Sequence, residues 1–226
     1  MRLKFTFILA SLLFILPLFA IAAQVAPPPN LAVKAYLLQD FNSGSIIVES
    51  KKDERIEPAS LTKIMTAYLS FDAIQHGHLK LDQILPVSEK AWKVEGSKMF
   101  IDPKTPVTVD ELLHGMIIQS GNDASITLAI GVAGSEEQFA DMMNKQAAKL
   151  GMTGTHFMNA TGLPDKEHYT TAQDLMTLAS SHNRRLRLGC VILLYVYSLT
   201  EYKRLYSNGK SRIKAVASVI KSWAVV

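Results

Sequence analysis

Cysteine is nearly absent from this chain of 226 residues: Cys190 stands alone, so no internal disulfide can form. Stability must therefore come from packing of a hydrophobic core. Histidine is scarce too, and no histidine has cysteine or glutamate at metal-ligand spacing; the six lie at positions 76, 78, 114, 156, 168 and 182. We therefore expect neither a metal site nor a cofactor.

The N-terminus has the pattern of a secretory signal peptide. Arg2 and Lys4 precede an apolar run, and residues 20–22 read Ala-Ile-Ala, an A-x-A cleavage signal. We interpret residues 1–22 as a signal peptide, with an uncleaved membrane anchor as the alternative. Residues 23–30 contain three consecutive prolines and are expected to form an extended linker. The pattern predicts secretion across the inner membrane into the periplasm.

The last part of the chain, residues 181–226, lacks proline and aspartate, although the preceding part uses both freely. It carries nine Lys or Arg residues against one acid, Glu201, within a chain whose formal net charge is only +4. Such a basic segment is typical of contact with nucleic acid or with an anionic membrane surface. Because the chain is predicted to be exported, we expect no nucleic-acid partner, and peripheral association with the outer face of the cytoplasmic membrane stays open.

Strand and helix signals occur in the central part. Residues 31–50 hold two apolar, β-branched runs around Asn42-Ser43-Gly44, which predicts a β-hairpin. Helix starts are expected at residues 58–60, 108, 135 and 171, and the apolar segment 123–134 is expected to be a buried helix. The sum predicts an α+β protein of three-layer type with a helical centre.

A serine and a lysine stand three residues apart in "PASLTK", at the first of these helix starts. Positions i and i+3 share a helix face, so Ser60 could be a nucleophile with Lys63 as its base. The alternative is a capping serine followed by a solvated lysine. The same spacing recurs at Ser207, Ser211 and Ser218, so the motif alone does not discriminate between the two.

A polar break interrupts the apolar sequence at Ser120-Gly121-Asn122, between "MIIQ" and "ITLAIG". Burial would favour apolar residues there, so the break indicates hydroxyl and amide groups at the edge of the core. The alternative is a plain turn that ends a helix.

Together "PASLTKIMTAYLSFDAI" and "GMIIQSGNDASITLAI" resemble the serine penicillin-binding proteins and β-lactamases, whose signatures are S-x-x-K, S-x-N and K-T-G. The resemblance is closest to the D-alanyl-D-alanine carboxypeptidases and covers about residues 31–180. It implies a β-lactamase/transpeptidase-like α/β/α fold with an antiparallel sheet around a helical cluster.

The resemblance also implies a chemistry. Ser60 would attack the bond between two terminal D-alanines of a peptidoglycan stem peptide, and Lys63 would be the general base. Ser120 would relay a proton to the leaving amine, and Asn122 would bind the substrate amide. β-Lactam antibiotics would acylate the same serine.

One signature is absent, because Lys-Thr-Gly occurs nowhere in the chain. The nearest substitute is Lys210-Ser211-Arg212, in which an arginine takes the place of the glycine. We therefore expect the chain to leave the family pattern near Ser180, the sheet to be incomplete and the activity to be impaired. The alternatives are a D,D-endopeptidase or β-lactamase of the same superfamily, and a non-catalytic fragment.

Overall fold

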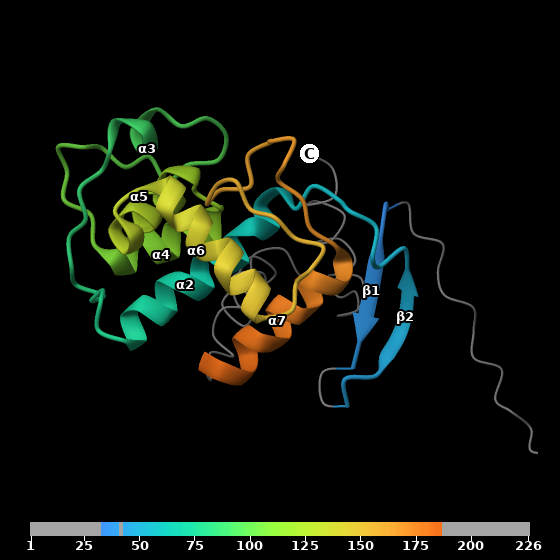
Figure 1. Cartoon of the computed structure of the whole chain (residues 1–226). Coiled ribbons are helices and arrows are strands. Elements are labelled where there is room, and N and C mark those ends of the chain that lie inside the picture. The colour runs from blue at the N-terminus through green and yellow to red at the C-terminus, as the bar shows by residue number, and fades with distance from the viewer. Residues whose placement is uncertain (1–32, 41–42, 187–226) are drawn as a thin grey trace, which may run out of the picture. The chain divides into compact units, whose positions relative to one another are not determined.

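The computed structural model describes residues 33–40 and 43–186, the side chains of residues 182–186 excepted. The predicted signal peptide, the linker, Lys210-Ser211-Arg212 and nearly all of the 181–226 segment lie outside these residues. The described part combines a two-stranded sheet with a cluster of helices (Figure 1). This α+β arrangement with a small antiparallel sheet is the one that the sequence predicts.

The predicted hairpin is confirmed. Strands β1 (Tyr36–Gln39) and β2 (Ile46–Ser50) pair antiparallel, with Tyr36 opposite Ser50. The Gly44 N–H donates to the Asp40 carbonyl at 2.9 Å and closes the turn. β1 also packs against the helix α7 (Ala172–Leu186), which ties the ribbon to the rest of the described chain.

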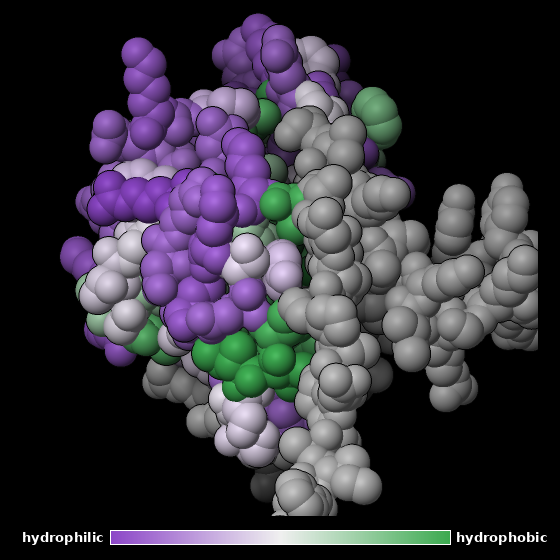
Figure 2. All heavy atoms as spheres, turned by 90° about the vertical axis from the view of Figure 1, so that its right-hand side faces the viewer, coloured by the Kyte–Doolittle hydropathy of each residue, from purple (hydrophilic) through white to green (hydrophobic). Residues whose placement is uncertain are grey.

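The ribbon, which is the β1–β2 hairpin, leaves apolar side chains partly exposed, among them Leu38, Ile46 and Ile47. Figure 2 looks from the side on which Figure 1 shows the ribbon, and hydrophobic surface gathers there between hydrophilic side chains.

Within the described residues the helical part contains six elements besides α7. They are the 3₁₀ segment η2 (Ala59–Thr62), α2 (Lys63–Gln75), α3 (Glu89–Lys93), α4 (Val109–Gln119), α5 (Asn122–Ala133) and α6 (Glu136–Lys149). No helix of the described residues is long and apolar enough to cross a bilayer.

The helix starts predicted at residues 108, 135 and 171 are confirmed by their capping bonds, whereas at 58–60 an uncapped 3₁₀ segment precedes the α-helix. Thr108 and Glu111 form a capping box at the start of α4, and the Ser135 side chain accepts from the Gln138 N–H at the start of α6. The Thr171 hydroxyl accepts from the Asp174 N–H at the start of α7. α7 continues to Leu186, so the helix runs through the boundary that the sequence predicts near Ser180.

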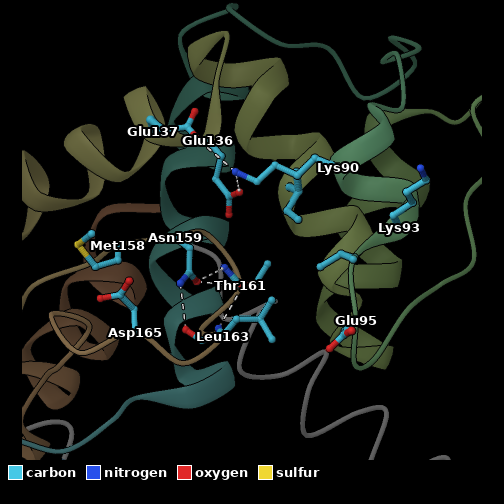
Figure 3. A pocket seen from close by; sticks show the side chains of 12 residues that line it. Lys90, Lys93, Glu95, Glu136, Glu137, Met158, Asn159, Thr161, Leu163 and Asp165 are labelled. Atoms are coloured by element: carbon cyan, nitrogen blue, oxygen red, sulfur yellow. Dashed lines mark hydrogen bonds and ion pairs between the residues drawn. The ribbon is translucent and has the colours of Figure 1, made fainter.

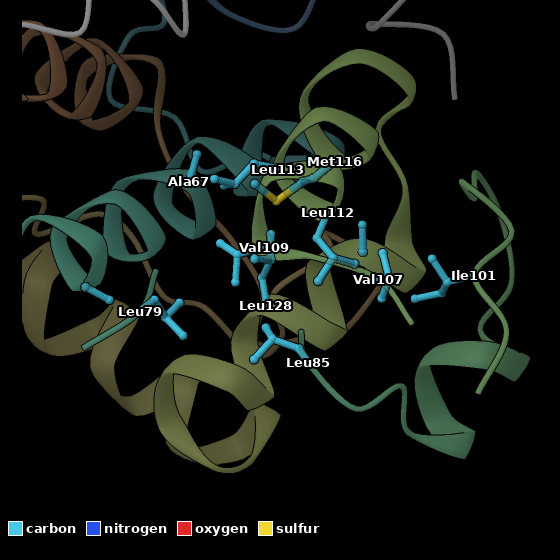
Figure 4. Close-up of a cluster of buried hydrophobic side chains, with 12 residues drawn as sticks. Ala67, Leu79, Leu85, Ile101, Val107, Val109, Leu112, Leu113, Met116 and Leu128 are labelled. Carbon is cyan, nitrogen blue, oxygen red and sulfur yellow. The ribbon is translucent and has the colours of Figure 1, made fainter. Parts of the chain in front are cut away.

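Helix α5 forms the centre of the fold, as its near-continuous apolar sequence predicts. Every residue of α5 from Asn122 to Ala129 is buried, and the helix contacts α2, α3, α4 and α6. One hydrophobic cluster includes Leu112, Met116 and Leu128 (Figure 4); a second includes Met65, Phe139, Met143 and Leu178. Burying one such side chain contributes about 1.5–3 kcal/mol. The packing of α5 therefore holds its first turn, which begins at Asn122, in a fixed position.

Candidate active site

Ser60 lies in a tight turn rather than in a regular helix. The Lys63 N–H donates to the Ser60 carbonyl and closes the 3₁₀ turn, in which residues three apart eclipse one another. Ser60 and Lys63 therefore lie on one side of the turn. The residue at the N-cap position is Pro58 and no side chain caps the segment, so the interpretation of Ser60 as a helix cap is wrong.

Lys63 is buried, with 7% of its surface exposed, so the interpretation as a solvated cation is also wrong. Its Nζ donates to Asn122 Oδ1 at 2.8 Å and to the Thr161 carbonyl at 2.7 Å. Burial lowers the pKa of Lys63 to about 8. A neutral amine has two N–H groups and one lone pair. The two carbonyl oxygens can accept both N–H groups, which leaves the lone pair available to take a proton.

The polar break places Asn122 against this amine, with Ser120 two residues before Asn122. Ser120 ends α4 in the left-handed conformation, with φ of 58°, and its buried Oγ has no protein hydrogen-bond partner among the described residues. Asn122 begins α5, where its Oδ1 binds Lys63 and its Nδ2 donates to the Glu95 carbonyl at 2.7 Å. A buried hydroxyl without a partner costs about 1–3 kcal/mol, which favours a functional role for Ser120 over a plain turn.

The structure thus joins two of the four predicted residues directly, Lys63 with Asn122. Ser60 is held next to Lys63 by the 3₁₀ turn, and Ser120 is held next to Asn122 by the left-handed turn. Among the hydrogen bonds of the described residues, none joins a serine hydroxyl to the lysine amine.

Residues 95–101, which sequence reasoning assigned no role, hold the turn between α4 and α5. The Glu95 and Ser97 carbonyls accept from the Asn122 side chain and from its N–H, respectively. Asp123, which is 1% exposed, accepts from the Met99 N–H at 3.0 Å and from the Ile101 N–H at 3.2 Å. Asp123 is a charged residue in a mostly apolar helix, and this is the sequence signal that could have indicated its contacts with residues 95–101. We call these contacts of Asp123 with the Met99 and Ile101 N–H groups the clasp.

A second loop, residues 158–165, supplies the carbonyl that binds Lys63. Asn159 Oδ1 accepts from the N–H groups of Thr161 and Gly162 at 3.1 and 2.7 Å, and Asn159 Nδ2 donates to the Leu163 carbonyl. These bonds fix the turn and aim the Thr161 carbonyl at the amine. Sequence reasoning missed it because a backbone carbonyl carries no residue signature.

Thr62, between Ser60 and Lys63, is held by a buried histidine. His168 Nδ1 accepts from the Met158 N–H at 3.2 Å, so the ring proton is on Nε2, which lies 2.8 Å from Thr62 Oγ1. Burial lowers the pKa of His168 to about 4. The ring is neutral at pH 7 and donates to Thr62.

A cavity of about 520 Å³ adjoins the lysine network (Figure 3). Its walls come from α3, α5, the start of α6 and the 158–165 loop. It shares Glu95 and Thr161 with the network, since their carbonyls bind Asn122 and Lys63. Within the described part of the chain, no three His, Cys, Asp or Glu side chains gather to hold a metal ion.

The family model described as D-alanyl-D-alanine carboxypeptidase, peptidase S11, matches residues 22–214. The chain belongs to this family. The D-alanyl-D-alanine carboxypeptidase DacC of Escherichia coli (strain K12) is 41% identical over 166 residues, which are 71% of this chain and 42% of that relative. The matched range of the family model runs past Ser180, and the boundary predicted there stays a prediction.

Solved structures of this family have the same fold. The carboxypeptidase DacD of Francisella tularensis is 41% identical with a TM-score of 0.69, over 73% of this chain and 40% of that one. Penicillin binding protein 5 of Haemophilus influenzae is 35% identical with a TM-score of 0.69, over 73% of this chain and 48% of that one. The chain spans about 42% of the length of the curated carboxypeptidase from E. coli.

Proposed function

We propose that the chain hydrolyses the terminal D-Ala-D-Ala bond of peptidoglycan stem peptides through an acyl-enzyme on Ser60. The observation that carries this proposal is the buried Lys63 amine, whose two carbonyl partners occupy its N–H groups. Membership of the carboxypeptidase family supports the substrate class.

In the first step Lys63 Nζ takes the proton of Ser60 Oγ as this oxygen bonds to the scissile carbonyl carbon. The carbonyl electrons move to its oxygen, and the Ser60 N–H donates to the resulting oxyanion. One such donor is worth roughly 3–4 kcal/mol of transition-state stabilisation.

In the second step the tetrahedral intermediate collapses and the C–N bond to the last D-alanine breaks. The proton passes from Lys63 through the Ser120 hydroxyl to the leaving nitrogen. The Ser120 Oγ supports this role, because no residue in the described part of the chain binds it. Water then hydrolyses the ester on Ser60 and regenerates the hydroxyl. Asn122, held between Lys63 and Glu95, would orient the substrate amide.

We further propose that acylation is slow in this chain. The sequence contains no Lys-Thr-Gly, the signature that in this family supplies a cation for the substrate carboxylate and a second oxyanion donor. Loss of one such donor alone raises the barrier by roughly 3–4 kcal/mol. Export into the periplasm is part of the same proposal, and the signal-peptide pattern of residues 1–22 supports it.

The test is labelling of the purified full chain with a fluorescent penicillin, followed by mass spectrometry of the labelled peptide. We expect slow labelling on Ser60, none in Ser60→Ala, and unchanged labelling in Ser88→Ala, which removes a helix-capping serine outside the site. A folded protein that is not labelled after hours would contradict the proposal and favour a non-catalytic fragment.

The same preparation is incubated with a pentapeptide, a cross-linked muropeptide and a penicillin. We expect D-alanine release from the pentapeptide. Faster cleavage of the cross-link would indicate an endopeptidase, and faster opening of the penicillin ring would indicate a β-lactamase.

A further inference from the structure

Glu136, the first residue of α6, is a buried carboxylate that bonds two different parts of the fold. It is 5% exposed. Oε2 lies 2.8 Å from Lys90 Nζ on α3, and Oε1 accepts from the Ala160 N–H at 3.0 Å. Figure 3 shows Glu136 and Lys90 on one side of the cavity and the loop of Asn159 and Thr161 on the other.

Glu136 binds the N–H of Ala160, the residue before Thr161, whose carbonyl binds the Lys63 amine. The Ala160 N–H is bound by Glu136 and the Ala160 carbonyl accepts from Thr66 Oγ1 at 2.7 Å. The next carbonyl, that of Thr161, accepts from Lys63 Nζ at 2.7 Å. Both carbonyl bonds come from α2. Within the loop Asn159 Oδ1 holds the Thr161 and Gly162 N–H groups, and Glu136 adds the bond from α6 at the Ala160 N–H.

We propose that Glu136 is a positioning residue for Lys63: by binding the Ala160 amide, it keeps the Thr161 carbonyl against the lysine amine. Its catalytic importance rests on the proposed function, whereas the contact chain from Lys90 to Lys63 does not. Breaking the bond removes the loop's anchor on α6, so residues 160 and 161 can shift as one turn with Asn159 and water can reach Nζ.

The competing explanation is that Glu136 only links α3 to α6 through its ion pair with Lys90. The neighbouring residue Glu137 distinguishes between these two explanations. Glu137 Oε1 lies 3.0 Å from the same Lys90 Nζ, but its side chain is 76% exposed and binds no loop amide. Such an exposed pair contributes little, whereas a buried carboxylate needs all of its partners. Glu137 is therefore the matched control for loss of a Lys90 ion pair without loss of a contact to the 158–165 loop.

The readout is the protonation of Lys63 itself. Full-length protein is labelled at lysine Cε with ¹³C, the Lys63 signal is assigned with Lys63→Arg, and its shift is followed from pH 6 to 11. The two hydrogen-bond partners of Nζ are a carboxamide and a backbone carbonyl, neither of which titrates. Burial alone lowers the pKa of Lys63, so a change in its titration reports access of water.

We expect Glu136→Ala to raise the pKa of Lys63 from about 8 by about one unit, because water replaces the displaced loop. Glu136→Gln keeps an oxygen for the Ala160 N–H and should restore the wild-type titration. Glu137→Ala should leave it unchanged.

A folded Glu136→Ala protein whose Lys63 titrates as in the wild type would overturn the proposal and leave only the link between α3 and α6. If Glu136→Ala does not melt cooperatively, Glu136→Asp decides: it keeps the charge at the start of α6 but is one methylene too short to reach both partners. An unchanged titration there overturns the proposal as well. Because no turnover is needed, this result is independent of whether the chain releases D-alanine.

Discussion

The backbone of Gly162 packs directly against the carbonyl of Ala59, the residue before Ser60. A methyl group at Gly162 would lie 1.8 Å from the Ala59 oxygen, and its φ is +84°. Ala59 itself has a positive φ of 46°. The 158–165 loop and the Ser60 turn are therefore fitted backbone to backbone, without space for a side chain.

Gly162→Ala should destabilise the protein by about 3 kcal/mol, because the methyl group overlaps backbone and the positive φ adds strain. Gly151→Ala is the matched control: its φ is +76°, but nothing lies within 4 Å of the added methyl group. It should cost only about 1 kcal/mol. Urea unfolding of both variants measures the difference, and equal losses would mean that the contact with Ala59 contributes nothing.

The acylation rate should rise with pH through the titration of Lys63. With its pKa lowered to about 8, about a tenth of the amine is neutral at pH 7 and about nine tenths at pH 9, so the rate should rise about tenfold. Lys63→Met should abolish labelling by penicillin, whereas Lys149→Met, at the end of α6, should not affect it. Labelling rates between pH 6.5 and 9.5 provide the test, and a flat profile would assign the base to another group.

Stability should fall in acid because of His168. The pKa of His168 is about 4 in the folded protein, against 6.5 as its ordinary value, so the unfolded chain binds a proton at higher pH. The stabilisation is complete above pH 6.5 and is lost as the pH falls to 4, by about 3 kcal/mol.

Urea unfolding at pH 7, 5.5 and 4.5 measures this loss for the wild type and for His168→Gln, which cannot titrate. The other acid-sensitive groups are common to both proteins, so the difference in slope isolates the histidine. If the free energy of unfolding fell equally with pH in both proteins, His168 would bind its proton equally well in the folded and the unfolded chain. His78→Gln, at an exposed position, should behave as the wild type.

Asp123→Asn should loosen the clasp on the start of α5. The carboxylate accepts from two N–H groups of the 95–101 segment through separate oxygens, and a carboxamide would oppose an NH₂ group to one of them. The expected loss is about 1–3 kcal/mol, with faster hydrogen exchange at Ile101. Asp102→Asn, which removes an exposed carboxylate bonded to the Lys104 N–H, should change neither. Unaltered exchange at Ile101 would show that the segment is held by other contacts.

The sequence could predict what local chemistry determines. The helix starts at Thr108, Ser135 and Thr171 follow from side chains that bind N–H groups three residues away. The turn of Ser120 was visible because polar residues interrupt an apolar run. Lys63 and Asn122 were predicted as functional from the family motifs, and the structure adds that they touch.

What supports these residues could not be predicted, because it is made of backbone groups far away in sequence. The Glu95 and Thr161 carbonyls and the Ala160 N–H are peptide atoms that any residue type would supply. The contact from His168 to Thr62 spans 106 positions, and no periodicity or spacing signals such a pair. Only the tertiary packing of the chain brings these groups together.

The left-handed turn at Ser120 has a consequence for the directed evolution of a thermostable variant. Glycine there would relieve about 1 kcal/mol of backbone strain and would remove a buried hydroxyl that has no partner within residues 33–40 and 43–186. Selection for heat resistance alone should therefore favour Ser120→Gly and discard the proposed proton relay. At this position thermal tolerance and acyl transfer make opposite demands, so a screen has to measure both.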